Sequence, residues 1–106
     1  MAKYLIQVRY TADGVKGLLA DGGTARRAAA VKAIESVGGK MEAFYFALGE
    51  VDAYVIADLP DDASVVALEL VVNATGRINS STVKLITPED VDKAAKKTVA
   101  YRAPGG

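Results

Sequence analysis

The chain has 106 residues, the size of one small domain. Apolar residues make up 51% and charged residues 25%, and 13 basic side chains balance 13 acidic ones, which disfavours both intrinsic disorder and a nucleic-acid binder. The sequence contains no Cys and no His. This excludes disulfides, thiolate metal sites, cysteine nucleophiles and His-ligated haem, and it removes the commonest general base.

The N-terminus does not read as a signal peptide, because Gln7 and Arg9 break its apolar run and no small-residue cleavage site follows. The longest apolar stretch, residues 63–74, contains Glu69 and Asn73 and is too short to span a membrane. We therefore expect a cytoplasmic protein that has neither nucleic acid nor membrane as a partner.

The first part of the chain is predicted to form one strand and two helices. Residues 3–10 alternate between an apolar side and a mixed side, which is typical of a strand. Residues 12–20 predict a weak helix that ends at Asp21-Gly22-Gly23. Thr24 is a suitable N-cap for a second helix, which runs to Val37.

The middle of the chain is predicted to form a hairpin and a helix. Residues 40–48 and 51–59 read as two strands, and Gly49-Glu50 separates them at the spacing of a two-residue turn. After Pro60, an Asp N-cap starts a helix over residues 63–74 that is apolar almost all round.

The last part is predicted to form a fourth strand over residues 78–87 and a short helix. Thr87-Pro88-Glu89-Asp90 resembles a capping box with Pro at the first helical position. The tail after Asp92 carries four basic residues and no acid, so we divide the chain into a domain over residues 1–92 and a basic tail over residues 93–106. This tail is either a solvated end or an arm that reaches a partner chain.

The order β-α-β-β-α-β, with an extra short helix after the first strand and another at the C-terminus, predicts an α+β fold of the ferredoxin-like type. Right-handed crossovers place both main helices on one face of a four-stranded antiparallel sheet. The other face, which we call the open face, is left uncovered.

The predicted hairpin sorts the side chains between the two faces, because it pairs Tyr45 with Tyr54. The predicted helix-facing residues are Tyr4, Ile6, Val8, Phe44, Phe46, Leu48, Val51, Ala53 and Val55. The predicted open-face residues are Leu5, Gln7, Arg9, Met41, Ala43, Tyr45, Asp52, Tyr54 and Ile56. If Val83 and Leu85 face the helices, then the open face also receives Thr82, Lys84 and Ile86.

An open face of this composition is unusually apolar for the exposed surface of a monomer. The simplest cover is a second copy of the same sheet, which gives a symmetric homodimer, or a higher homo-oligomer, with polar side chains trapped between the sheets.

The candidate ligand-binding residues all belong to this face or to its hairpin: Gln7, Arg9, Tyr45, Glu50, Asp52 and Tyr54. Arg9 would hold an anionic group, Asp52 would act as a base, and the two tyrosines would offer hydroxyls in an apolar pocket. The alternatives are a hairpin turn with a backbone-bonded Asp52, an Arg9–Asp52 ion pair, and interface packing of the tyrosines.

Two other sets of charged residues have simpler structural explanations. Asp58, Asp61 and Asp62 are hard-cation ligands by type, but a strand end and a helix cap account for them. Arg26-Arg27 could meet an anion at a helix start, and a solvated helix face is the alternative. We expect neither a metal nor a cofactor.

The central stretch resembles the GYD domain family. The resemblance rests on Gly38-Gly39-Lys40, residues 44–52, residues 59–62, Gly76-Arg77-Ile78 and Thr87-Pro88-Glu89-Asp90, and it covers roughly residues 3–92. Gly49 and Asp52 match the Gly-x-Tyr-Asp pattern, whereas Val51 stands where the family has Tyr. The resemblance implies a dimeric α/β-barrel fold, and it implies no established activity.

Two functions fit this sequence. In the first, a dimer binds a small, partly apolar molecule at the open face, with cofactor-independent proton transfer or oxidation by Arg9, Asp52 and Tyr54 as its chemistry. In the second, the chain is a non-catalytic assembly or regulatory module whose sheet face only mediates oligomerisation.

Overall fold

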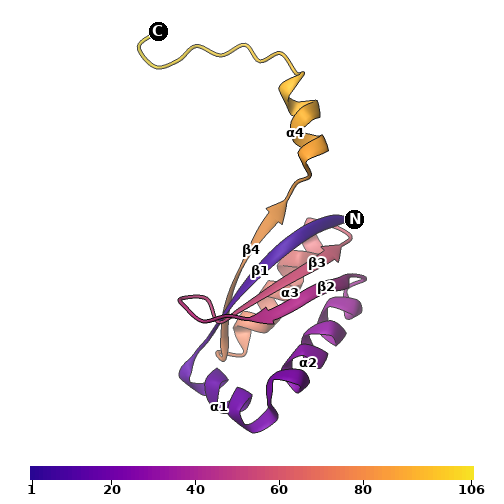
Figure 1. Ribbon diagram of the computed structural model, residues 1–106, viewed down its shortest axis with the longest axis vertical. Helices are drawn as coiled ribbons and strands as arrows, with labels where there is room; N and C mark the ends of the chain where they lie inside the picture. The colour runs from indigo at the N-terminus through magenta and orange to yellow at the C-terminus, as the bar shows by residue number, and fades with distance from the viewer.

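The computed structural model describes residues 1–106 and confirms the predicted α+β, ferredoxin-like architecture (Figure 1). The elements are β1 (Ala2–Tyr10), α1 (Ala12–Asp21), α2 (Gly23–Ser36), β2 (Lys40–Phe46), β3 (Ala53–Leu59), α3 (Asp62–Ala74), β4 (Ile78–Leu85) and α4 (Pro88–Ala95). The four strands form one antiparallel sheet in the order β2-β3-β1-β4. Helices α2 and α3 cover one face, and the other face is open.

Side-chain caps start three of the four helices. Thr11, Asp61 and Thr87 accept hydrogen bonds from the first-turn N–H groups of α1, α3 and α4, respectively. Thr24 was predicted to cap α2, and this is wrong, because the helix begins at Gly23 with Gly22 as its N-cap. The short α1–α2 junction needs a φ of 86° at Gly22, a conformation that glycine adopts without steric cost.

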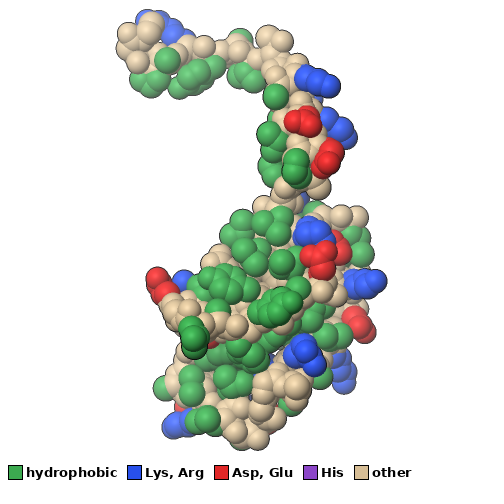
Figure 2. Space-filling view, in the orientation of Figure 1, with side chains coloured by type: hydrophobic (Ala, Val, Ile, Leu, Met, Phe, Trp, Pro, Cys, Tyr) green, Lys and Arg blue, Asp and Glu red, His purple; other side chains and the backbone are tan.

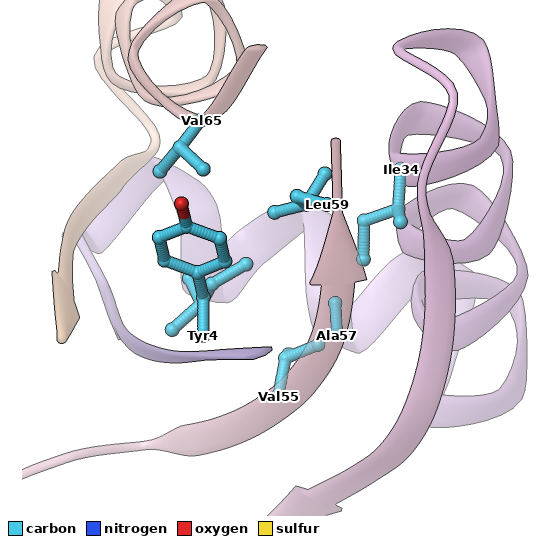
Figure 3. Packing of buried hydrophobic residues seen from close by; sticks show 7 residues of the cluster. Tyr4, Ile34, Val55, Ala57, Leu59 and Val65 are labelled. Atoms are coloured by element: carbon cyan, nitrogen blue, oxygen red, sulfur yellow. The ribbon is translucent and has the colours of Figure 1, made fainter. Parts of the chain in front are cut away.

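The core lies between the sheet and the two main helices (Figure 3). Tyr4 and Ile6 of β1 and Val55, Ala57 and Leu59 of β3 form its floor. From the helices, α2 contributes Ile34 and α3 contributes Val65. Only 10 of the 106 residues are buried, so the domain rests on a small core.

Helix α1 packs directly on the turn between α3 and β4. A Cβ on Gly14 would lie 1.9 Å from the carbonyl oxygen of Arg77, so only glycine permits this approach. The N–H of Thr11 donates to the Arg77 carbonyl oxygen at 3.0 Å, and the Thr11 hydroxyl donates to the Gly76 carbonyl oxygen at 2.8 Å. These contacts fix α1 beside the end of the sheet.

The face assignment of β4 is the reverse of the one considered from the sequence. Tyr4 lies opposite Lys84 and Ile6 opposite Thr82, so Lys84 and Thr82 share the helix-covered face. Val83 lies opposite Leu5 on the open face instead. The carboxylates of Glu69 and Asp62 on α3 bind Thr82 and Lys84, respectively. Because these polar groups have partners there, the helix-covered side of this edge strand is hydrophilic.

A β-bulge in β2 overturns a second assignment. Met41 pairs with Ala57 and Ala43 pairs with Ile56, which leaves Glu42 as the extra residue. Met41 therefore packs against the core and does not lie on the open face, as had been expected.

The hairpin register is as predicted: Phe44, Tyr45 and Phe46 pair with Val55, Tyr54 and Ala53. The strands nevertheless end at Phe46 and resume at Ala53, so a longer loop replaces the two-residue turn. Val51 is buried as expected, whereas Leu48 is fully exposed and does not face the helices. Leu48 lies in the part of the loop where no ladder bonds fix the strand alternation.

The C-terminal segment projects away from the domain. Helix α4 and the residues after it extend beyond the end of the sheet (Figure 1). The radius of gyration is 17.2 Å, against about 13 Å for a compact chain of this length. No helix in the structure combines the length and apolar character that crossing a bilayer requires.

Candidate functional site

The open face carries both apolar and polar side chains (Figure 2). Tyr45 and Tyr54 lie opposite each other, and Gln7 lies opposite Tyr54 on the neighbouring strand. Tyr45 is 72% exposed and Tyr54 is 38% exposed. The structure thus brings Gln7, Tyr45 and Tyr54 together, as the sequence predicted. That they bind a ligand stays a prediction.

Arg9 and Asp52 have different partners. The Arg9 Nη2 atom lies 3.8 Å from Oε1 of Glu50, which makes an exposed ion pair. Asp52 Oδ2 accepts a hydrogen bond of 2.8 Å from the N–H of Tyr10, and the Asp52 N–H donates to the Val8 carbonyl oxygen at 2.9 Å. Asp52 therefore anchors the hairpin to the end of β1, and the proposed Arg9–Asp52 pair is not formed.

A basic residue holds two carboxylates together at the other end of the open face. Lys3 Nζ donates to Glu42 Oε1 at 2.9 Å and to Asp58 Oδ1 at 3.0 Å. The hydrogen bond to Glu42, followed by the one to Asp58, raises the pKa of Lys3 above its ordinary value. Asp61 instead caps α3, where the hydrogen bonds from Ser64 lower the pKa of its carboxyl.

A carboxylate on the helix side of the sheet is held by neutral donors. The hydroxyls of Ser80 and Thr82 donate to the two oxygens of Glu69, and the Asn73 amide donates to Glu69 Oε2 at 3.1 Å. Asn73 is itself fixed by the N–H of Ser80, which donates to Asn73 Oδ1 at 2.8 Å. This network joins α3 to β4 and leaves Glu69 without a cationic partner. The sequence showed only one acid in an apolar helix, so the network could not be foreseen.

A second polar cluster lies at the start of α3. The Tyr4 hydroxyl donates to Asp62 Oδ1 at 2.5 Å, and Lys84 Nζ donates to the same atom at 3.4 Å. The hydrogen bond from Tyr4, with the one from Lys84, holds the pKa of Asp62 below its ordinary value. The same contacts with Asp62 raise the pKa of both Tyr4 and Lys84.

This cluster makes the stability of the fold depend on pH at both extremes. The lowered pKa of Asp62 contributes stability that is complete above its ordinary value of 3.8 and is lost as the pH falls through the folded value. The raised pKa of Tyr4 contributes stability that is complete below 10.0 and is lost as the pH rises through the folded value. The measurement is the midpoint of urea unfolding as a function of pH. We expect Asp62→Asn to reduce the fall of this midpoint at low pH (the acid limb), and Tyr4→Phe to reduce its fall at high pH (the alkaline limb).

The matched control is Tyr101→Phe, because Tyr101 is an exposed tyrosine in the C-terminal tail. An alkaline limb that responds equally to Tyr4→Phe and Tyr101→Phe would contradict the assignment of that limb to the buried phenol.

An apolar chamber opens between the two main helices and the sheet. Its volume is about 110 Å³, and 12 of its 15 lining residues are hydrophobic. Small side chains of α2 leave this space, since Ala29, Ala30 and Ala33 line it where larger residues would fill it. Its polar lining residues are Arg26, Glu69 and Ser80.

A wider and more polar chamber adjoins the first. Its volume is about 440 Å³, and it is bounded by α1, the start of α2, the end of α3 and the start of β4. Gly17 of α1 lines it, and a Cβ at that position would meet no atom within 4 Å. The two chambers share four lining residues, Tyr10, Arg26, Val72 and Ile78. They form one site, which we call the double chamber.

The double chamber has a basic outer part. Arg26 and Arg77 line the outer chamber together with one acid, Asp21. The five ion pairs of the structure involve neither arginine, so both cationic charges are free to meet a ligand. Helix α2, on which Arg26 lies, has no acid in its first turn and no side-chain cap. The sequence had favoured a solvated helix face for Arg26. In the structure α1 packs beside α2, and Arg26 lines the chamber between them.

A comparison with protein-family models matches residues 4–95 to the GYD domain. A comparison with curated proteins finds no match.

Proposed function

The chain belongs to the GYD domain family, and we propose that it binds a small molecule in the double chamber. The observation that carries the proposal is the junction of an apolar chamber with a wider one at the half-buried Arg26, which forms no ion pair. Ligand sites are typically concave and mostly apolar, with a few polar groups that fix orientation.

The chemistry of the lining selects the class of ligand. An apolar inner space of about 110 Å³ suits a short aliphatic chain or a small ring. The outer chamber has two arginines against one acid, and Glu69, the acid of the inner chamber, is already bonded to Asn73, Ser80 and Thr82. The two arginines therefore favour an anionic group in the outer chamber. The proposed ligand is therefore a small amphipathic anion, whose carboxylate meets Arg26 and whose apolar part enters between α2 and α3.

The open face lies on the other side of the sheet from the double chamber, and we propose that it binds a second copy of the chain. Its exposed tyrosines and Val83, which is 45% exposed, support a sheet-to-sheet homodimer. Turnover by Arg9, Asp52 and Tyr54 stays a prediction. If neither chamber takes a ligand, the alternative of a non-catalytic assembly or regulatory module applies.

Titration calorimetry with straight-chain carboxylates from butanoate to octanoate tests the ligand class. We expect the affinity to rise about fourfold for each methylene until the inner chamber is full. Hexanoate is expected to bind more tightly than the uncharged hexanamide. Arg26→Gln should weaken hexanoate binding about tenfold to a hundredfold and leave hexanamide binding unchanged.

Two further variants make this test specific. Arg27→Gln is the matched control, since Arg27 is the exposed neighbour that lines neither chamber. Ala33→Leu should shorten the chain length that binds best, because the larger side chain occupies the inner chamber. Equal binding of acid and amide, or equal effects of the two arginine variants, would overturn the proposed ligand class.

A further inference from the structure

The C-terminal arm, which we define as residues 87–106, is not tied to its own domain by polar bonds. Its hydrogen bonds, such as those between Thr87 and Asp90 and between Arg102 and Gly106, join residues of the arm to each other. None of the five ion pairs of the structure includes an arm residue.

The arm has an apolar side that has no cover in a single chain. Val91 of α4 is 51% exposed, and Val99 and Tyr101 are 76% and 75% exposed. Hydrophobic side chains gather on one side of α4, and charged side chains lie on the other (Figure 2). A helix of eight residues is marginal in water without packing of its apolar side. Packing of this apolar side on another surface would therefore stabilise the arm.

The exposed area of the chain indicates how much surface is to be covered. The accessible area is 7351 Å², whereas a compact monomer of 11.0 kDa exposes about 5,600 Å². The excess of roughly 1,700 Å² per chain exceeds the roughly 800 Å² that each partner buries in a standard interface. A contact between two copies that uses both the open face and the arm would account for this excess.

The positive charge of the arm lies in its last part, the tail over residues 93–106. Residues 93–106 contain four basic residues and no acid, whereas residues 1–92 contain nine basic residues and all 13 acids. The whole arm also includes Glu89, Asp90 and Asp92, so residues 87–106 carry a net charge of +1 and residues 1–86 a net charge of −1, and the positive charge of the arm is concentrated in its tail. Exposed acids stand at both ends of the open face: Glu42, 51% exposed in its side chain, pairs with Lys3, and Glu50, 90% exposed, is held only by a 3.8 Å contact with Arg9.

The connection to the domain directs the arm away from its own sheet. Only Ile86 and Thr87 separate β4 from α4. Thr87 is extended, with a φ of −81° and a ψ of 157°, and Ile86 has no turn assignment. The extended backbone of this linker carries the arm away from the sheet and does not fold it back on its own domain (Figure 1).

We propose that the arm is exchanged between two copies of the chain, so that each arm docks along the open-face border of the other copy. The apolar side of the arm extends the sheet-to-sheet contact, and its basic tail meets the acids at the ends of the partner's open face. This inference rests on the second-copy part of the proposed function and is independent of the ligand.

Photo-crosslinking of the full chain tests the exchange directly. The variant Tyr101→p-benzoylphenylalanine is mixed with an excess of ¹⁵N-labelled unmodified chain, equilibrated, irradiated and digested for mass spectrometry. Exchange predicts crosslinked peptides that pair a ¹⁴N arm with a ¹⁵N sheet segment. Crosslinks between ¹⁴N peptides alone would show that each arm folds back on its own domain, and this would overturn the proposal.

Charge reversal provides the second measurement. The triple variant Lys93→Glu, Lys96→Glu, Lys97→Glu is expected to raise the dimer dissociation constant at least tenfold in sedimentation equilibrium at low salt. Lys16→Glu with Lys32→Glu, on the exposed faces of α1 and α2, is the control and should change it little. If the triple variant leaves the dimer dissociation constant unchanged, the arm exchange alone is overturned. If the unmodified chain is monomeric, the second-copy proposal is overturned as well.

Discussion

Tyr54→Glu is expected to convert the proposed homodimer into monomers, with a dissociation constant at least about 100-fold higher than that of the unmodified chain. Tyr54 lies on β3 near the middle of the open face, between Tyr45 and Gln7 on the adjacent strands. A two-fold contact between sheets buries the new carboxylate twice, once from each copy. Sedimentation velocity over a range of concentrations measures the change.

The matched control for this variant is Leu19→Glu. Leu19 lies on α1 and is 81% exposed, so the change adds the same charge to an apolar surface position away from the open face. Thermal unfolding monitored by circular dichroism checks that both variants fold. If Tyr54→Glu dimerises as well as Leu19→Glu does, then the open face does not hold the second copy.

Leu59→Ala is expected to lower the free energy of unfolding by about 2–5 kcal/mol, the largest stability change that we predict. The Leu59 side chain is fully buried, and it packs in the core with Ile34 of α2 (Figure 3). A domain with so few buried residues cannot close the resulting cavity cheaply. Since native domains are stable by only about 5–15 kcal/mol, this loss is a large share of the stability.

Leu70→Ala makes the same chemical change at an exposed position, because Leu70 is 67% exposed on α3. We expect it to change the free energy of unfolding by about 0.5 kcal/mol or less. Both variants are compared by urea denaturation at one protein concentration, since association would stabilise the folded state. A Leu70→Ala loss as large as that of Leu59→Ala would mean that the outer face of α3 is also buried in solution.

The element order followed from local patterns because each signal is short-range. Alternation in residues 3–10, the capping residues Asp61 and Thr87, and the glycine at position 22 act within a few residues of the chain. The hairpin register is also local, so the pairing of Tyr45 with Tyr54 could be predicted. From these elements, the handedness of the crossovers fixes the layers.

Assignments that depend on a distant partner could not be made in this way. The face of β4 is set by Glu69 and Asp62 of α3, which bind its hydroxyls and Lys84 across the helix–sheet interface. The bulge at Glu42 shifts Met41 by one residue, and a shift of one residue exchanges the two faces of a strand. Periodicity alone carries neither piece of information.

By itself, the sequence determined the ferredoxin-like fold, the apolar side of β1 and the pairing of Tyr45 with Tyr54, because backbone propensity and hydrophobic alternation act along the chain. The tertiary structure alone decided that Asp52 bonds to the end of β1, that Arg26 stands at a chamber, and that the C-terminal arm lies apart from its domain. Each of these depends on groups far apart in sequence, and only the packing of α1, α2 and α3 on the sheet brings such groups together.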